Sequence, residues 1–245
     1  MRAIPSKSFQ DTEERMKEYN EFQEDEFANF AYIIAHDLKS PLRAIQILTE
    51  WIVRDNGDRL TESGQEHLAL LQDRVKRMDL IIDGVSQYSR IGREIIEPES
   101  VDLNQMVDYI IAVMAIPEHI TCRRRKTLPV IQCKRDHVKM VFQHLIENAV
   151  KFMDKSAGKV EIDVSEGIHF WEFSISDNGP GIDEKYQTQI FEIFQTLYSK
   201  DDKNGCGIGL TLSKKIVETA GGRLWLESQK GAGSTFLFTL PKNEA

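Results

Sequence analysis

A histidine and an aspartate stand side by side in the stretch AYIIAHDLKSPLRAI, residues 31–45. A carboxylate that accepts the Nδ1 proton of an imidazole orients the ring and makes its Nε2 nitrogen a better nucleophile, which is the chemistry expected of His36 beside Asp37. Ser40 and Arg43, at i+4 and i+7 on a helix, share the face of His36 and can contact a negatively charged group there. Most surface histidines have no function, so these neighbours make His36 a candidate nucleophile.

Three motifs in the second half of the chain could bind a nucleotide: HLIENAVKF at 144–152, DNGPGI at 177–182 and GCGIGL at 205–210. Each is weak alone, because an asparagine on a helix is usually solvated and a run of glycines is often only a turn. In the first motif, Asn148 offers a carboxamide oxygen of the kind that Mg²⁺ prefers. Lys151, three residues later, can reach a phosphate.

The two glycine motifs suit the rest of a nucleotide. Asp177 ends an apolar stretch and can accept a hydrogen bond from an adenine amino group. Gly179 and Gly181 allow the backbone to approach the base closely. The last motif leads directly into a predicted helix, whose N-terminal amide groups and dipole favour a triphosphate. Its three glycines are Gly205, Gly207 and Gly209.

A polar segment, residues 183–204, separates the two glycine motifs. Phe191 and Phe194 are its apolar anchors. Segments of this kind close over bound substrates in many enzymes, so we expect a lid over the nucleotide site.

Two helices must position His36. Apolar residues alternate at spacings of four and three over residues 27–52 and again over 68–89, which predicts two seams of a coiled coil or helix bundle. Asn56-Gly57 predicts a turn between them, hence an antiparallel hairpin. One hairpin cannot enclose either seam, whereas two chains can do so as a four-helix bundle, so we expect a homodimer. His36 points away from the seams, which are Phe27, Ala31, Ile34, Leu38, Pro41, Ile45, Leu48, Ile52 and Leu68, Leu71, Val75, Met78, Ile82, Val85, Ser89.

Pro41 falls inside the first predicted helix, five residues after His36. It cannot donate a hydrogen bond to the carbonyl of residue 37 and its ring crowds that carbonyl, at a cost on the order of 3 kcal/mol. We therefore expect the helix to bend just after His36. We interpret the bend as a way to vary the reach of the histidine; the alternative is a kink without a function.

An α/β domain must position the nucleotide motifs. Residues 92–100, with a glycine and a proline, end the second helix and mark a boundary. Beyond it, helical patterns alternate with short strand patterns, which predicts helices packed on one face of a mixed sheet. The predicted helices are 103–114, 135–153 and 208–220, and the predicted strands are 159–165, 169–177, 222–228 and 234–241.

Composition excludes several classes of protein. The formal net charge of −8 argues against nucleic-acid and anionic-membrane binding, and the basic run 123–126 is expected to be a solvated strand face. No stretch approaches the ~18 apolar residues of a membrane span, and no signal peptide is present. The three cysteines fit neither a disulfide framework nor a zinc site. Cys122 and Cys133 could face each other across a hairpin, but reduced thiols in the cytoplasm are the preferred interpretation.

The motifs together resemble the catalytic core of a sensor histidine kinase of the phytochrome-like and cyanobacterial type. AHDLKSPLRAI resembles the phosphoacceptor box, ENAVKF the N-box, DNGPGI the first glycine box, FEIFQTL the F-box and GCGIGL the second glycine box. GGRLWLESQKGAGSTFLFTLP resembles the closing hairpin of the family. The resemblance covers about residues 26–241, and five motifs in the expected order make it highly specific.

The resemblance implies a fold and a division of the chain. The fold is an α-helical hairpin that forms a dimeric four-helix bundle, followed by an α/β sandwich that binds ATP. The implied parts are an N-terminal linker helix (1–25), a dimerisation and histidine phosphotransfer domain (26–93), a hinge (94–100) and a catalytic ATP-binding domain (101–243).

The resemblance also implies a reaction. The γ-phosphoryl group of Mg-ATP is transferred to His36, with Asp37 as the general base, and then to an aspartate in the receiver domain of a response regulator. Asn148 is the implied magnesium ligand, and no sensor is recognised, so the input is separate or missing. The implied nucleotide-binding residues are Asn148, Lys151, Phe152, Asp177, Gly179, Gly181, Ile182, Phe194, Gly205, Gly207, Ile208, Gly209 and Leu210.

Two residues depart from the pattern of the family. His144 stands where the N-box usually has an asparagine and where gyrase-type relatives have a glutamate that activates water. Ser40 stands where many relatives have the threonine or asparagine associated with dephosphorylating the partner. A dimeric docking module that binds nucleotide without turnover is therefore an alternative function. A gyrase-type ATPase is another, against which the missing glutamate and the His36 hairpin both argue.

Overall fold

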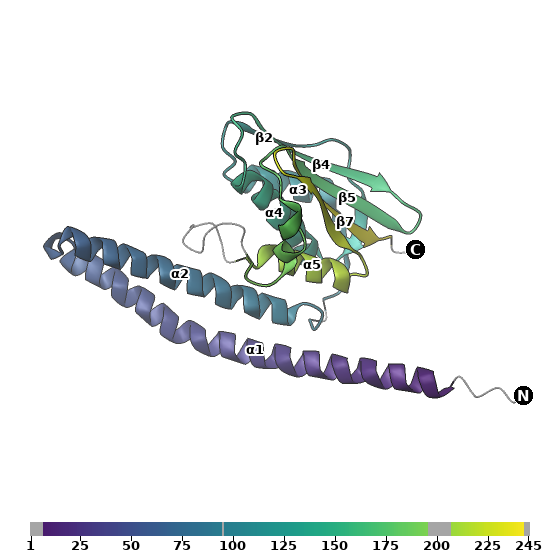
Figure 1. Ribbon diagram of the computed structural model, residues 1–245, viewed down its shortest axis with the longest axis horizontal. Coiled ribbons are helices and arrows are strands. Elements are labelled where there is room, and N and C mark those ends of the chain that lie inside the picture. Colours follow the sequence, from purple (N-terminus) through teal and green to yellow (C-terminus); the bar gives the residue numbers. More distant parts are fainter. Residues whose placement is uncertain (1–6, 95, 196–206, 243–245) are drawn as a thin grey trace, which may run out of the picture. The chain divides into compact units, whose positions relative to one another are not determined.

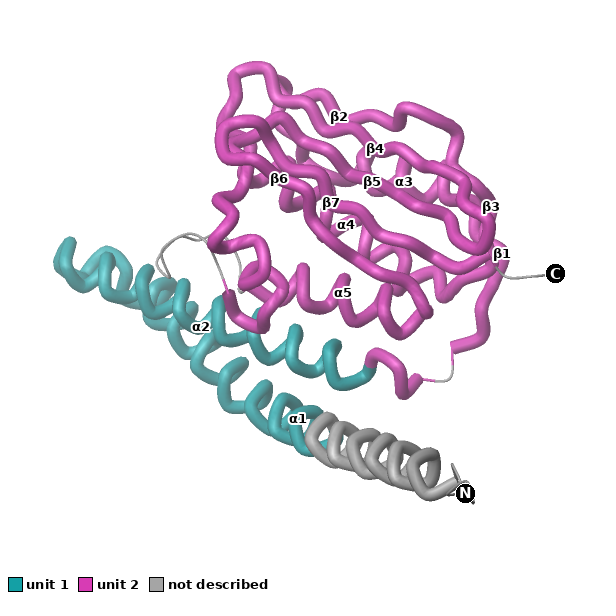
Figure 2. Tube along the Cα trace, turned by 45° about the vertical axis from the view of Figure 1, so that its right-hand side comes forward, with its two compact units in different colours: residues 1–90 teal, residues 91–245 magenta. Residues whose placement is uncertain are grey.

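The computed structural model describes the backbone of residues 7–94, 96–195 and 207–242, and the side chains of these ranges from residue 29 onward. The chain divides into two compact units between Arg90 and Ile91 (Figure 2). Gly205, Cys206 and the end of the predicted lid lie outside the described residues. Within the described ranges, no helix is both long and apolar enough to cross a membrane.

The first unit is a helical hairpin (Figure 1). Helix α1 spans Lys7–Asn56, a short 3-10 turn η1 spans Gly57–Arg59, and α2 spans Glu62–Arg90. Thr61 caps α2, because its Oγ1 accepts a hydrogen bond from the amide of Gly64 at 3.2 Å. The predicted hairpin and its turn at Asn56-Gly57 are confirmed.

The hairpin has its own small core. Ala35 and Leu42 of α1 are buried against Val75 and Ile82 of α2. These α1 residues follow Ile34 and Pro41 of the predicted seam by one position, so the seam lies on a neighbouring face of the helix. In α2, by contrast, the predicted seam divides between this core and an exposed face.

The predicted seam of α1 stays largely exposed in the single chain. Its isoleucine and leucine residues are between 40% and 53% accessible, and Leu71 and Met78 of α2 are 44% and 50% accessible. The hairpin therefore presents an apolar face that its own chain does not cover. On α1 this face comprises Ile34, Leu38, Ile45, Leu48 and Ile52.

Helix α1 continues through Pro41. Figure 1 shows that the helix is bowed rather than straight, as expected of a helix with an interior proline. An ion pair between Lys39 and Asp83 ties α1 to α2 close to this proline.

The second unit is a two-layer α/β domain, as predicted. A mixed five-stranded sheet has the order β2-β4-β5-β7-β6, in which only β2 and β4 are parallel. Three helices cover one face of the sheet (Figure 1). A small antiparallel sheet pairs β1 with β3. The bounds are β1 Glu99–Asp102, α3 Leu103–Val113, β2 Ile120–Arg124, β3 Val130–Cys133, α4 Arg135–Lys151, β4 Gly158–Glu166, β5 Phe170–Asp177, α5 Gly209–Thr219, β6 Leu224–Gln229 and β7 Gly233–Pro241.

Three phenylalanines form the centre of the core between α4 and the sheet. The ring of Phe142 meets those of Phe173 and Phe238 edge-on, with centroids 5.6 Å and 5.3 Å away. All three side chains are fully buried. Edge-to-face aromatic pairs add about 0.5–1.5 kcal/mol each beyond the area they bury, so this cluster fixes α4, and its nucleotide motif, on the sheet.

For the region before α4, the structure excludes one alternative and corrects one expectation. Cys122 lies in β2 and Cys133 in β3, two strands of different sheets, so they do not face each other across a hairpin. Both are free thiols, and burial raises the pKa of each to about 11. The basic run is not uniformly solvated either, because Arg124 turns toward α3.

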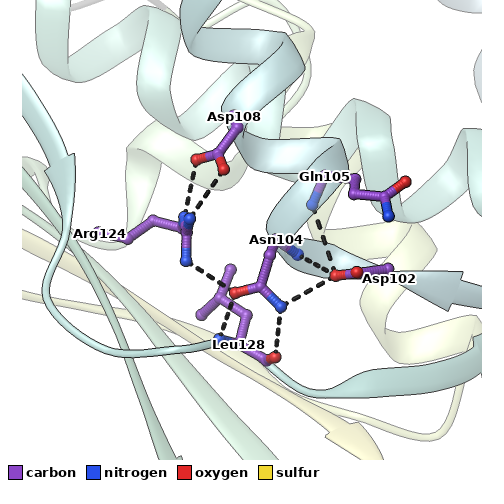
Figure 3. Close-up of polar contacts among 6 residues, drawn as sticks. All are labelled: Asp102, Asn104, Gln105, Asp108, Arg124 and Leu128. Atoms are coloured by element: carbon purple, nitrogen blue, oxygen red, sulfur yellow. Dashed lines mark hydrogen bonds and ion pairs between the residues drawn. The ribbon is translucent and has the colours of Figure 1, made fainter.

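Arg124 joins β2 to α3 (Figure 3). Its guanidinium donates to both carboxylate oxygens of Asp108, at 2.8 and 2.7 Å, and to Oδ1 of Asn104 at 2.7 Å. Asn104 in turn donates from Nδ2 to the carbonyl of Leu128 at 2.8 Å. The carboxylate of Asp102 caps α3 by accepting from the amide of Asn104. The network holds the start of α3 against the loop after β2.

Candidate active site

His36 lies on the solvent-exposed side of α1. Its side chain is 76% accessible and that of Asp37 is 74% accessible. Nδ1 of His36 lies 3.2 Å from Oδ1 of Asp37. With the Nδ1 proton donated to this carboxylate, the Nε2 lone pair faces solvent. Ser40 and Arg43 are also exposed, as expected of residues on the same face.

Asp177 is the last residue of β5, and only one of its two carboxylate oxygens accepts hydrogen bonds from described residues. Its Oδ1 accepts hydrogen bonds from the amides of Gly179 at 2.8 Å and Ser234 at 3.3 Å. No described residue donates to Oδ2. Burial raises the pKa of this carboxyl, against the effect of the two backbone donors. Oδ2 of Asp177 is therefore a half-buried acceptor that receives no hydrogen bond from the rest of the described chain.

The loop after Asp177 is clasped by the turn between β6 and β7. Gly181 has a positive φ of 65°, and a Cβ there would overlap the carbonyl of Gln229. The amide of Ile182 donates to Oγ of Ser228 at 2.8 Å. The missing side chain of Gly181 makes room for this turn, and its expected approach to a base stays a prediction. The close approach is to protein backbone.

The C-terminal end of α4 adjoins the same loop. The carbonyl of Phe152 lies 3.7 Å from the place of a Cβ on Gly179. Asn148 is half-buried, and its carboxamide forms no hydrogen bond with any described residue. An uncommitted carboxamide oxygen at this position fits a magnesium ligand. Lys151 is exposed in the last turn, with Nζ 5.0 Å from the ring centroid of Phe152.

The start of α5 offers free amide groups. The helix begins at Gly209, and the preceding Ile208 supplies no side-chain cap. The first amide groups of such a helix lack partners within the helix and suit an anion. Gly207 has a φ of 72°, and a Cβ there would lie 2.5 Å from the carbonyl of Gln195. Leu210 is half-buried within the first turn.

Phe194 is the one non-glycine residue with a positive φ in the described ranges, at 65°. Its amide donates to the carbonyl of Gly207 at 3.1 Å, so Phe194 is fixed beside the start of α5. Its side chain remains exposed. Phe191, the other expected anchor, packs on Phe236, with ring centroids 6.5 Å apart.

The described nucleotide candidates all belong to the second unit, whereas His36, Asp37, Ser40 and Arg43 belong to the first. Sequence reasoning missed the serines that support the site. The hydroxyls of Ser228 and Ser234 share a hydrogen bond of 2.9 Å beneath the Asp177 loop. Oγ of Ser213 lies 3.3 Å from Nδ1 of His144. The only hint was that these hydroxyls lie in otherwise apolar or turn segments.

Two family models match the chain. The His Kinase A (phospho-acceptor) domain matches residues 28–94. The family described as histidine kinase-, DNA gyrase B-, and HSP90-like ATPase matches residues 133–244. The chain carries the two domains of a histidine kinase catalytic core. The phospho-acceptor match over the His36 hairpin removes the gyrase-type alternative.

Curated relatives of this histidine kinase include cyanobacterial phytochromes. Cyanobacterial phytochrome B of Nostoc sp. is 40% identical over 216 residues, which cover 86% of this chain and 29% of that protein. Phytochrome-like protein Cph1 of Synechocystis sp. is 32% identical over 214 residues, with the same shares of 86% and 29%. The chain thus spans less than a third of the length of these relatives.

Solved structures share the fold of the kinase. Full-length ShkA, in complex with AMPPNP, has a TM-score of 0.66 at 21% identity, covering 89% of this chain and 46% of that one. ThkA in complex with the response regulator protein TrrA has a TM-score of 0.60 at 20% identity, covering 93% and 66%.

Proposed function

We propose that the kinase transfers the γ-phosphoryl group of Mg-ATP to its own His36 and then passes it to an aspartate in the receiver domain of a response regulator. The observation that carries this proposal is the exposed His36–Asp37 pair inside the phospho-acceptor match. Asp37 holds the Nδ1 proton and stabilises the positive charge that develops on the ring as Nε2 attacks phosphorus.

The nucleotide roles follow from the chemistry of the groups that the second unit brings together. Oδ2 of Asp177 accepts a hydrogen bond from the adenine amino group. The first amides of α5 donate hydrogen bonds to the phosphates. Lys151 adds a positive charge beside the phosphates. The Asn148 oxygen holds Mg²⁺, which when bound neutralises phosphate charge. Phe152, Ile182 and Phe194 border the site, and Gly181 and Gly207 allow its loops to pack closely on neighbouring backbone.

The uncovered apolar face of the hairpin supports a homodimer. Exposed apolar patches of this extent usually mark an interaction surface. The face runs along both helices, from Ile34 to Ile52 on α1 and through Leu71 and Met78 on α2. Two copies packed on these faces would form a four-helix bundle and remove the seams from water.

The receiver domain is proposed to dock beside His36. Ile47 and Trp51 follow His36 at i+11 and i+15, roughly on its face of α1, and are 39% and 50% accessible. An exposed tryptophan on roughly the same helix face as a reactive residue, about four turns along the helix, is a candidate interface hot spot. The structure of ThkA with TrrA shows that a kinase of this fold binds a response regulator.

Labelled ATP tests the proposed function. With the label in the γ-phosphate, we expect acid-labile label on the protein. No label despite nucleotide binding would favour the docking module without turnover, and free phosphate without protein label would favour hydrolysis.

Trp51→Ala should slow transfer of label from the phosphorylated kinase to its receiver domain by about tenfold, the effect typical of truncating an interface anchor. Autophosphorylation should be unchanged, because Trp51 lies far along α1 from His36. The receiver domain is first identified by screening with labelled wild-type kinase. Val53→Ala, which truncates an exposed apolar side chain on the side of α1 away from Trp51, is the control. Equal transfer by Trp51→Ala and Val53→Ala would show that the receiver docks elsewhere.

Pro41→Ala should stabilise α1, because it restores a hydrogen bond to the carbonyl of residue 37 and removes the clash of the ring. We expect a higher melting temperature and unchanged ADP affinity. Autophosphorylation or transfer should change in rate, since both need His36 to meet a second domain in a defined geometry. A more stable variant with both rates at wild-type values would mean that the bend has no role in catalysis.

A further inference from the structure

His144 is the residue of the N-box motif that the proposed function leaves without a role. It lies one turn before Asn148 on α4, and its ring rests against the first turn of α5. A Cβ added to Gly209 would lie 3.4 Å from Cγ and 3.6 Å from Nδ1 of His144. Gly209 therefore lets the ring approach the α5 backbone closely.

The hydrogen bonds of the ring have a defined direction. Ser213, which is fully buried, donates from Oγ to the carbonyl of Gly209 at 2.9 Å. A hydroxyl has one proton, so the same oxygen can only accept from Nδ1 of His144, 3.3 Å away. Nδ1 therefore carries a proton. Burial lowers the pKa of His144, so the ring is neutral near pH 7 and Nε2 has none.

These two hydrogen bonds run from His144 on α4, through Ser213, to the carbonyl of Gly209. They therefore fix the first turn of α5, whose amides are proposed to bind the phosphates, relative to α4. An Nε2 atom without a proton cannot donate to a phosphate. The ring can instead help phosphate binding by holding α5 in place.

We propose that His144 is a positioning residue for the phosphate end of the nucleotide: its Nδ1–H donates to Ser213, which donates to the carbonyl of Gly209, and this fixes the amides of the first turn of α5. The inference rests on the proposed nucleotide site and adds a role for a residue on which that proposal does not depend.

Three substitutions distinguish the contribution of Nδ1 from that of Nε2. In His144→Asn the amide nitrogen takes the place of Nδ1, in His144→Gln it reaches that of Nε2, and in His144→Ala both are absent. The Ala and Gln variants should bind ADP about three- to tenfold more weakly, the range for one lost hydrogen bond. The Asn variant should stay within about twofold of wild type, because it keeps that hydrogen bond.

Calorimetric titrations with ADP and with adenosine, both without Mg²⁺, provide the measurement. Adenosine affinity should be unchanged in all three variants. Rescue by Gln but not by Asn would overturn the proposal in favour of a direct role of Nε2. An equal loss for adenosine would overturn it in favour of general support of the fold. A wild-type kinase that binds adenosine but gains nothing from the phosphates of ADP would refute it as well, whereas binding of neither ligand would refute the nucleotide site itself.

The tautomer provides a test without any ligand. Long-range ¹H–¹⁵N correlation spectra of the intact kinase should show His144 protonated at Nδ1. Ser213→Ala should speed hydrogen exchange of the Leu212 amide, which donates to the carbonyl of Ile208 at the start of α5. A wild-type ring protonated at Nε2 would contradict the proposed direction of the chain, whatever the ligand data show.

Discussion

His36→Gln should abolish acid-labile labelling of the kinase by ATP. Glutamine fills a similar volume and stays solvated, so the hairpin should keep its stability, but it has no nucleophilic ring nitrogen. His67, which is also exposed on the hairpin, provides the matched control, and His67→Gln should label normally. Label remaining on His36→Gln would mean that another residue accepts the phosphoryl group.

Asp37→Asn should slow labelling without abolishing it. Losing a general base typically costs ~10²–10⁴ in rate. The amide can still contact the ring but cannot stabilise its positive charge. ADP affinity should be unchanged, because Asp37 belongs to the other unit. A rate within a few-fold of wild type would show that His36 is activated from elsewhere, for example by the ATP-binding unit.

Asp177→Asn should weaken nucleotide binding by about 10²-fold, since a hydrogen bond is lost and a donor faces the amino group of adenine without a partner. Its Oδ1 can still accept from the amides of Gly179 and Ser234, so the loop should keep its shape. The loss should be the same with and without Mg²⁺. In Asn148→Ala, the matched comparison, only the magnesium-dependent part should fall. Calorimetric titration of ADP measures both; parallel losses in the two variants would contradict separate roles.

The same substitution should raise the stability of the ATP-binding unit. Burial raises the folded-state pKa of Asp177 above its unfolded value. The carboxyl therefore favours the folded state fully only below its unfolded pKa, and this contribution is lost as pH rises through the folded pKa. At neutral pH the buried, ionised carboxylate lowers the free energy of unfolding, and asparagine removes this cost. We expect the melting temperature of Asp177→Asn to exceed that of wild type at pH 7, with the difference shrinking toward pH 4.

The sequence predicted the features that depend on local pattern. The hairpin followed from two long apolar repeats, and the helices and later strands of the second unit were predicted within a few residues. The sequence did not show which face of α1 packs on α2, because Ala35 and Leu42 extend the apolar stripe of α1 to a second face. Which face is used depends on the shape of the partner helix.

The missed features are non-local. Strands β1, β2 and β3 are four or five residues long. β2 ends in two arginines, so it has little apolar pattern to detect. Arg124 is half-buried only because Asp108 and Asn104 reach it from α3. His144 and Ser213, 69 residues apart, meet only when α5 packs on α4. The motifs revealed the candidate residues of the site, whereas its supports depend on tertiary packing.

The small core of the hairpin has a consequence for control of the kinase. With so few side chains sheltered between α1 and α2, a separated hairpin would gain too little from burial to offset its conformational entropy. Folding and association of this unit would then be one event, and its midpoint would depend on protein concentration. Under such linkage a free folded protomer is too rare to act as an off state. Signals would have to act within an intact pair of chains, by shifting or rotating helices against each other, rather than by assembling and dismantling the pair.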